Sequence, residues 1–225
     1  RKNAPRNKHV MKELKEGFKY TFGFAPIRYL ILLLALVSLV GMPYTVLMPV
    51  FAKEILHGGS HTFGFLMGAS GMGALTGAFF LASRKNVLGL DKIIPLAAAT
   101  FGAGLIAFSF SRYFALSMGL MVFVGLGMML QMASTNTILQ TIVDDDKRGR
   151  VMSFYTMAFM GTAPFGSFIA GSLASKIGAP NTLVVGGIAC LLGTLVFVRY
   201  LPTLRKAVRP IYVRLGFLNN SPESR

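Results

Sequence analysis

Long stretches without charge divide the chain into apolar segments. Lys, Arg, Asp and Glu are absent from six runs, at 29–52, 55–83, 93–111, 113–143, 151–175 and 177–198. Each run has 19 residues or more, and a helix needs about 20 apolar residues to cross a bilayer. The pattern therefore predicts an all-α integral membrane protein with six transmembrane helices.

The polar segments between these runs set the expected domain organisation. A basic linker occupies 1–28, a tail occupies 202–225, and the bundle between them has approximate spans at 29–52, 62–83, 93–111, 113–140, 151–175 and 181–201. Only 14% of residues are charged, against about a quarter in a soluble domain, which excludes an ordinary soluble fold. The chain begins at Arg1 rather than at a methionine, so we expect it to be a piece of a longer protein.

Basic residues are distributed unevenly around the spans. Twenty of the 23 Lys and Arg residues lie in the two ends and in the second and fourth loops, which share one side of a six-span protein. Short loops rich in Lys and Arg stay in the cytoplasm, so both ends are predicted to be cytoplasmic. The net charge of +15 would suggest a nucleic-acid partner on a soluble face. Here it lies between spans, so we expect the lipid bilayer as a partner and no nucleic acid.

Small residues and prolines within the spans predict close packing and bends. The second span contains Gly64-x-x-x-Gly68 and Gly73-x-x-x-Gly77, and small residues let helix backbones approach closely in lipid. Pro43 and Pro164 each remove a backbone hydrogen bond and are expected to kink their helices. This combination favours a bundle that moves, although a static bundle can contain the same residues.

Repeated and ordered motifs connect the chain to a known family. Leu-Ala-Ser-basic occurs at 81–84 and again at 173–176, three spans apart on helices of opposite direction, as a 3+3 inverted repeat predicts. A basic amphipathic lead at 11–20 precedes the spans, and the fifth span contains Arg148-Gly-Arg-Val-Met-Ser153 and Gly161-Thr-Ala-Pro-Phe-Gly166. With these motifs the chain resembles the C-terminal six-helix half of a twelve-helix major facilitator superfamily transporter, most similar to the bacterial enterobactin and macrolide exporter branch.

This resemblance implies a function and a partner. It implies alternating-access efflux of an amphipathic small molecule, a siderophore or a drug, across a bacterial cytoplasmic (inner) membrane, together with an N-terminal six-helix half. Two alternatives stay open: a six-span transporter that works as a homodimer with a second copy, and a non-transporting scaffold or truncated fragment. The sequence does not determine the substrate, the coupling ion or the direction of transport.

Two basic loops are candidates for gating at the cytoplasmic side. The second loop keeps Arg84 and Lys85 but has no acidic residue directly before Arg84, where the family often has one. The resemblance places a basic-Gly-basic turn at Arg148, Gly149 and Arg150. These residues are expected to gate the cytoplasmic side, with simple positive-inside anchoring as the alternative.

Polar residues at membrane depth are the candidate substrate ligands. In the family that the chain resembles, the first and fourth helices of each half line the central cavity. The resemblance therefore places five residues beside a substrate path: Tyr44, Thr45, Gln131, Thr135 and Asn136. At 3.6 residues per turn, Gln131 and Thr135 share one side of the fourth span and Asn136 lies on another. The alternative is hydrogen bonding between helices.

Asp, Glu, Lys and Arg are absent from the depth of every span. Intramembrane ionisable groups are the usual proton and ion relays, so a coupling carboxylate is expected on the N-terminal half. The same absence argues against an enzyme. Asp144, Asp145 and Asp146 precede the fifth span, where a helix N-terminus stabilises carboxylates, and His57 and His61 lie in a glycine-containing loop. We therefore expect neither a metal site nor a cofactor.

Overall fold

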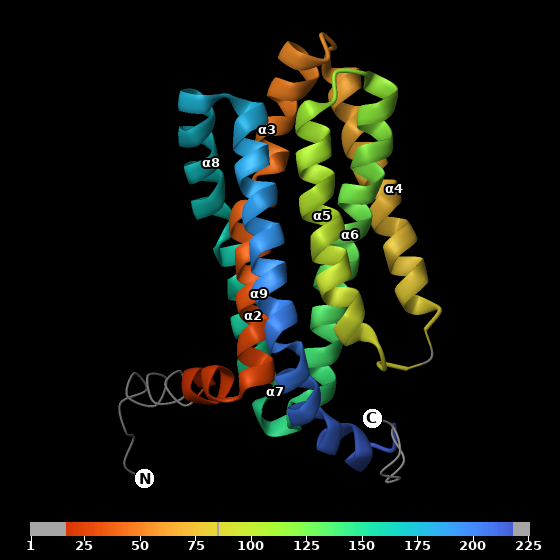
Figure 1. Ribbon diagram of the computed structural model, residues 1–225, viewed down its shortest axis with the longest axis vertical. Coiled ribbons are helices and arrows are strands. Elements are labelled where there is room, and N and C mark those ends of the chain that lie inside the picture. The colour runs from red at the N-terminus through yellow and green to blue at the C-terminus, as the bar shows by residue number, and fades with distance from the viewer. Residues whose placement is uncertain (1–16, 85, 218–225) are drawn as a thin grey trace, which may run out of the picture.

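Helices make up almost all of the described chain. The computed structural model describes residues 17–84 and 86–217, and this part contains no strand. The helices form an elongated bundle with both described ends of the chain at its lower end (Figure 1). Their bounds are α2 Ala25–Val40, α3 Tyr44–Val50, η1 Phe51–Ile55, α4 Ser60–Ala82, α5 Leu90–Phe110, α6 Phe114–Ile142, α7 Asp145–Thr156, η2 Met157–Gly161, α8 Ala163–Ile177 and α9 Ala179–Arg214.

These elements form six spans that are long and apolar enough to cross a membrane. The all-helical, six-span prediction is confirmed. Four spans are single helices, whereas the first consists of α2, α3 and η1 and the fifth of α7, η2 and α8. Pro43 lies in the break between α2 and α3, and Pro164 is the second residue of α8, directly after the π-helical turn η2. Proline cannot donate the helical hydrogen bond, so both interruptions have a local cause.

Helix neighbours follow a regular scheme. The fourth span packs against the second and the third. In the same way, the first span packs against the fifth and the sixth. The third and sixth spans, α5 and α9, pack against each other. Exchanging the first three spans for the last three leaves this set of neighbours unchanged. The fold therefore has the arrangement expected of a 3+3 inverted repeat.

Glycines bring the helix backbones together at these contacts. A Cβ added at Gly73 of α4 would lie 1.9 Å from the carbonyl oxygen of Val122, and one at Gly125 of α6 would lie 1.9 Å from that of Ser70. Gly102 of α5 and Gly187 of α9 likewise face each other's carbonyl oxygens. In contrast, nothing lies within 4 Å of a Cβ added at Gly64 or Gly68. The glycines of the second span therefore serve two different faces.

The last helix extends past its apolar run. Charge reappears at Arg199, but α9 continues to Arg214 because charged residues end an apolar stretch without ending a helix. Leu204 and Val208 remain buried along this extension. Arg205 Nε lies 2.5 Å from Asp91 Oδ2 in the first turn of α5. This ion pair fixes the extension beside α5 at the end of the bundle that carries most of the basic residues, which we call the basic end.

The glycine contacts generate a stability prediction. We expect Gly73→Ala and Gly125→Ala each to destabilise the bundle by about 1–3 kcal/mol, because the new methyl group would overlap a backbone carbonyl that cannot move without separating the helices. This corresponds to a fall of about 2–12 °C in the thermal midpoint of the detergent-purified chain. Gly119→Ala in α6 is the matched control, since open space surrounds that position. Equal midpoints for Gly125→Ala and the control would contradict the packing argument.

Candidate functional site

Tyr44 and Thr45 lie at the start of α3, directly after the break in the first span. Tyr44 is buried, and its hydroxyl lies 3.1 Å from Ser70 Oγ of α4. Thr45 is half-buried, and its hydroxyl donates to the carbonyl oxygen of Met42 at 3.1 Å. In this conformation Tyr44 therefore connects the first span to the second. The Thr45 hydroxyl gives a second hydrogen bond to the Met42 carbonyl oxygen, which also accepts the backbone N–H of Thr45.

One polar face of α6 is enclosed inside the bundle. Gln131, Ser134 and Thr135 all have zero exposure. Among the described residues none of their side-chain polar atoms has a hydrogen-bond partner. Leaving a buried polar group unpaired costs about 1–3 kcal/mol. Gln131 and Thr135 thus lie against the neighbouring helices rather than on an open surface. Their burial without hydrogen-bond partners lowers the stability of this conformation.

The second polar face of α6 is accessible. Asn136 is half-buried and Gln140 is exposed, and the Gln140 side-chain amide donates to Asn136 Oδ1. Tyr155 of α7 donates from its hydroxyl to the carbonyl oxygen of Met132 at 3.2 Å, which holds the two helices together beside Asn136. Of the three residues predicted in the fourth span, Asn136 is the one that is not fully buried.

A hollow lined by methionines lies on the uncovered face of α7 and η2. It has a volume of about 540 Å³ and is lined by Gly149, Met152, Ser153, Thr156, Met157, Met160 and Gly161. Methionine side chains are flexible and polarisable and adapt to irregular apolar ligands. The hydroxyls of Ser153 and Thr156 donate to carbonyls of their own helix, so their oxygens keep lone pairs toward the hollow. The hollow is thus apolar with two weak acceptors.

Sequence reasoning missed this hollow. Met152, Thr156 and Met160 recur every four residues, a spacing that places them on one face of a helix. That signal does not distinguish an open face from a packed one. Only the arrangement of the neighbouring helices leaves this face uncovered, so the sequence pattern alone could not identify it.

Ser38 of α2 supports the π-helical turn beneath the hollow. It is fully buried, and its hydroxyl donates to the carbonyl oxygen of Phe159 at 2.5 Å. A π-helical turn inserts one residue into an α-helix and disturbs the regular hydrogen bonds, and such turns are frequent at functional sites. The Ser38 hydrogen bond satisfies one of the disturbed carbonyls and thereby fixes η2 against the first span.

The predicted gating residues lie at the basic end, apart from Lys85, which is outside the described residues. The Arg84 guanidinium donates to the carbonyl oxygen of Leu88 at 2.7 Å and lies over the Phe80 ring. Arg148 forms an ion pair with Asp145 of its own helical turn at 2.6 Å. Gly149 borders the hollow, and the Arg150 side chain lies beside Gly17. The structure therefore brings Gly149 to the methionine-lined hollow but does not bring Arg84 there.

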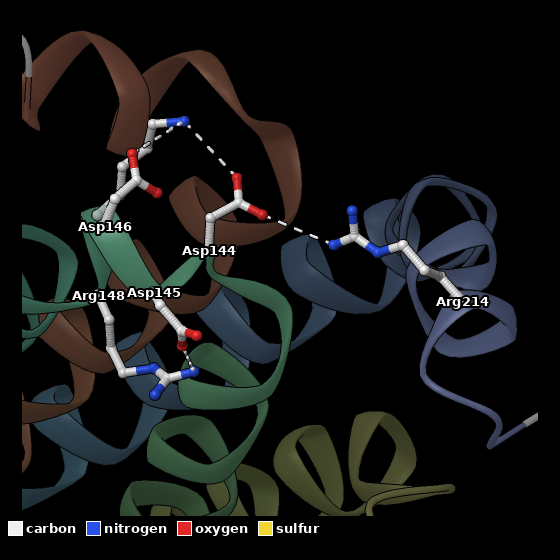
Figure 2. Close-up of polar contacts among 6 residues, drawn as sticks. Asp144, Asp145, Asp146, Arg148 and Arg214 are labelled. Atoms are coloured by element: carbon white, nitrogen blue, oxygen red, sulfur yellow. Dashed lines mark ion pairs between the residues drawn. The ribbon is translucent and has the colours of Figure 1, made fainter.

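The acidic cluster surrounds the first turn of α7. Asp144 is the residue before the helix, and Asp145 and Asp146 lie in its first turn. Figure 2 shows Asp144 between two cations: one carboxylate oxygen lies 3.6 Å from Lys147 Nζ and the other 3.6 Å from an Arg214 nitrogen. The carboxylates are therefore matched by neighbouring basic residues at this helix N-terminus.

Comparison with known proteins identifies related sequences. A family profile described as transmembrane secretion effector matches residues 1–210. The staphyloferrin A transporter of Staphylococcus aureus (strain NCTC 8325 / PS 47) is 27% identical over 164 residues, which make up 72% of this chain and 40% of that protein. The uncharacterized MFS-type transporter YfmI of Bacillus subtilis (strain 168) is 24% identical over 197 residues, 86% of this chain and 47% of the relative. The chain thus spans about half the length of the curated relatives it matches.

A solved structure shares the arrangement of the helices. The crystal structure of a mutant of the peptide transporter POT, in complex with alafosfalin, matches with a TM-score of 0.63 at 20% identity. The match covers 88% of this chain and 45% of that chain. This likeness concerns the fold: the six helices are arranged as in about half of that larger structure.

The enclosed polar face of α6 generates a second stability prediction. We expect Thr135→Val to raise the thermal midpoint by about 2–4 °C, because the substitution removes an unpaired buried hydroxyl and keeps the side-chain shape. Thr194→Val in α9 is the matched control, since that buried hydroxyl donates to the Cys190 carbonyl oxygen at 2.8 Å and its loss brings no gain. Thermal unfolding of both purified variants distinguishes the two cases. A lower midpoint for Thr135→Val would mean that the hydroxyl has a stabilising partner.

Proposed function

Because this chain belongs to the major facilitator superfamily, within its family of transmembrane secretion effectors, we propose that it exports an amphipathic small molecule by alternating access. Membership makes the protein a multi-pass membrane transporter and not an enzyme. One observation carries the proposal: the accessible polar face of α6 at Asn136 lies next to α7, whose outer face bears the methionine-lined hollow.

The chemistry of these two surfaces supports the substrate class. The hollow offers flexible apolar side chains and weak acceptors, whereas the Asn136 and Gln140 amides offer both donors and acceptors. Neither surface contains an ionisable side chain at membrane depth. A molecule with both an apolar and a polar part matches this pair. The name of the Staphylococcus aureus relative supports a siderophore as one such molecule, and a drug-like compound is the other.

A second six-helix bundle completes the proposed transporter. Gly64 and Gly68 of α4 have no neighbour within 4 Å of an added Cβ, and small residues of this kind let another helix approach closely in lipid. The curated relatives are about twice as long as the stretch that they share with this chain. We therefore propose that an N-terminal half of the same polypeptide packs here, rocks against this half and carries the coupling carboxylate.

The proposed orientation follows from the charges. The basic end holds the loops with Arg84 and Lys147–Arg150 and the extension of α9. Positive loops remain on the cytoplasmic side, so we place the basic end in the cytoplasm of a bacterium and the bundle in its inner membrane. The Arg148–Asp145 pair and the Arg150 contact with Gly17 make this end a suitable gate, with Gly149 as its link to the hollow.

The function can be tested at Asn136. In cells expressing the full-length transporter, we expect a lower intracellular amount of an exported probe, either ethidium or a secreted siderophore measured by mass spectrometry. Asn136→Leu should lower the export rate about 10-fold, since losing one or two polar contacts to the substrate costs about 1.4 kcal/mol. Export and membrane abundance are measured in the same cells.

A matched variant separates site and scaffold effects. Thr100→Val removes a hydroxyl from α5 that donates to Leu96 of its own helix, and its export rate should equal that of the parent. A higher intracellular amount in expressing cells would contradict export and indicate uptake. Normal export by Asn136→Leu would contradict the site, and an absence of transport of any probe by the parent would favour a non-transporting scaffold.

The open glycine face provides a separate test of the second bundle. We expect Gly68→Phe to abolish transport by the full-length protein at normal membrane abundance, because the ring would separate α4 from the proposed partner bundle. Gly119→Phe is the control, since it places the same ring at another open position. Equal transport by the two variants would contradict docking at this face. Cross-linking between two copies through a cysteine at position 68 would instead favour a homodimer.

A further inference from the structure

Two adjacent hollows at the basic end are not used by the proposed transport path. The first has a volume of about 380 Å³ and is lined by Tyr20, Phe24, Ile142, Asp144, Pro210, Ile211 and Arg214. The second has a volume of about 410 Å³ and is lined by Lys19, Tyr20, Gly23 and Phe24. Tyr20 and Phe24 line both, so the two hollows are neighbours, and we call the pair the interfacial groove.

The groove lies at the level where the spans leave the membrane. Its walls include Phe24 directly before α2, Ile142 at the end of α6 and Ile211 near the end of α9. The helical residues 17–23 lie across the bundle axis rather than along it (Figure 1). Phe18 of this segment is 55% exposed and Lys19 is exposed beside it. A helix with an apolar ring and a basic side chain in this orientation is typical of the lipid–water boundary.

Cations surround the polar end of the groove. Lys147 Nζ lies 4.7 Å from the centre of the Tyr20 ring and 3.6 Å from the Asp144 carboxylate, which also lies 3.6 Å from Arg214 (Figure 2). Both ion-pair distances exceed the 2.7–2.9 Å of a charge-assisted hydrogen bond. The ammonium and the guanidinium therefore keep donors available for a second, stronger acceptor. Lys19 adds a third cation, since it lines the second hollow together with Tyr20.

Tyr20 lines both hollows of the groove. Burial, together with the negative charge of Asp144, raises the pKa of Tyr20 above its ordinary value. The phenol therefore stays neutral at physiological pH and adds no negative charge. The first hollow also has apolar walls from Phe24, Ile142 and Ile211.

We propose that the interfacial groove binds one anionic phospholipid of the surrounding membrane. Its phosphate accepts hydrogen bonds from Arg214 and Lys19, the two cations that line the groove, with Lys147 close by. An acyl chain lies along Phe24, Ile142 and Ile211. A soluble phosphate would meet the same cations but also the Asp144 carboxylate, without apolar contacts to offset that repulsion. The lipid, and not its headgroup alone, matches the whole groove, and this inference does not depend on the direction of transport.

Native mass spectrometry of the full-length protein tests this proposal. The protein, purified in a neutral detergent, is titrated with dioleoyl-phosphatidylglycerol or dioleoyl-phosphatidylcholine, and retained lipid is counted. We expect one phosphatidylglycerol to be retained at concentrations at which phosphatidylcholine is not. Lys19→Gln with Arg214→Gln should weaken retention by about 25-fold, about fivefold for each cation. Asp144→Asn should strengthen it, because the cations then lose their competing carboxylate.

The control removes the same charge outside the groove. Lys206→Gln with Arg209→Gln changes two exposed positions of α9 that do not line the groove and should leave retention unchanged, with thermal midpoints confirming that all variants fold. Equal losses in the two double variants would overturn the specific site and leave only general attraction between a basic end and anionic lipid. Competition by glycerol 3-phosphate at the same concentration as the lipid would overturn the acyl-chain contact. Unchanged retention in Lys19→Gln with Arg214→Gln would overturn the proposal.

Discussion

Close approach of helix backbones at glycine is the constraint on which the rest of this bundle depends. Inside a bilayer the lipid chains are as apolar as the side chains, so helices gain little from burying apolar surface against one another. Contact between backbones supplies the packing instead. At Gly73 and Gly125 the second and fourth spans approach until a single added carbon would overlap a carbonyl oxygen. Gly102 and Gly187 join the third and sixth spans in the same way, and the symmetric order of neighbours follows from these contacts.

This packing leaves some polar groups enclosed and others open, and the division falls within one helix. Gln131, Ser134 and Thr135 of α6 lie against neighbouring helices without a partner among the described residues, whereas Asn136 and Gln140 remain accessible. An enclosed polar face is unfavourable in this conformation and would gain hydrogen bonds in one that admits water or substrate. The enclosed face thus shifts the equilibrium between conformations toward one that admits water or substrate, as suits a transporter that alternates between states.

The interruptions of the first and fifth spans lie where such a change would act. The hydrogen bond from Ser38 to the Phe159 carbonyl oxygen connects α2 to the π-helical turn η2, and the methionine-lined hollow lies on the same turn. Below it, Arg150 and Gly17 bring the fifth span against the segment that borders the interfacial groove. A movement of the fifth span would therefore displace residues both at the proposed substrate surface and at the lipid boundary.

The sequence by itself determined the membrane class, the six spans, the basic end and the family, because uncharged runs and the positions of Lys and Arg are properties of the chain alone. It also divided the polar residues of the fourth span into two faces, since helical period is local. It could not decide that Gln131 and Thr135 are enclosed while Asn136 is open, that Tyr44 joins Ser70, or that Met152 and Met160 border a hollow. Nor could it separate Gly73, which contacts a backbone, from Gly68, which faces open space. Those distinctions depend on which helix lies beside which, and only the tertiary structure sets that.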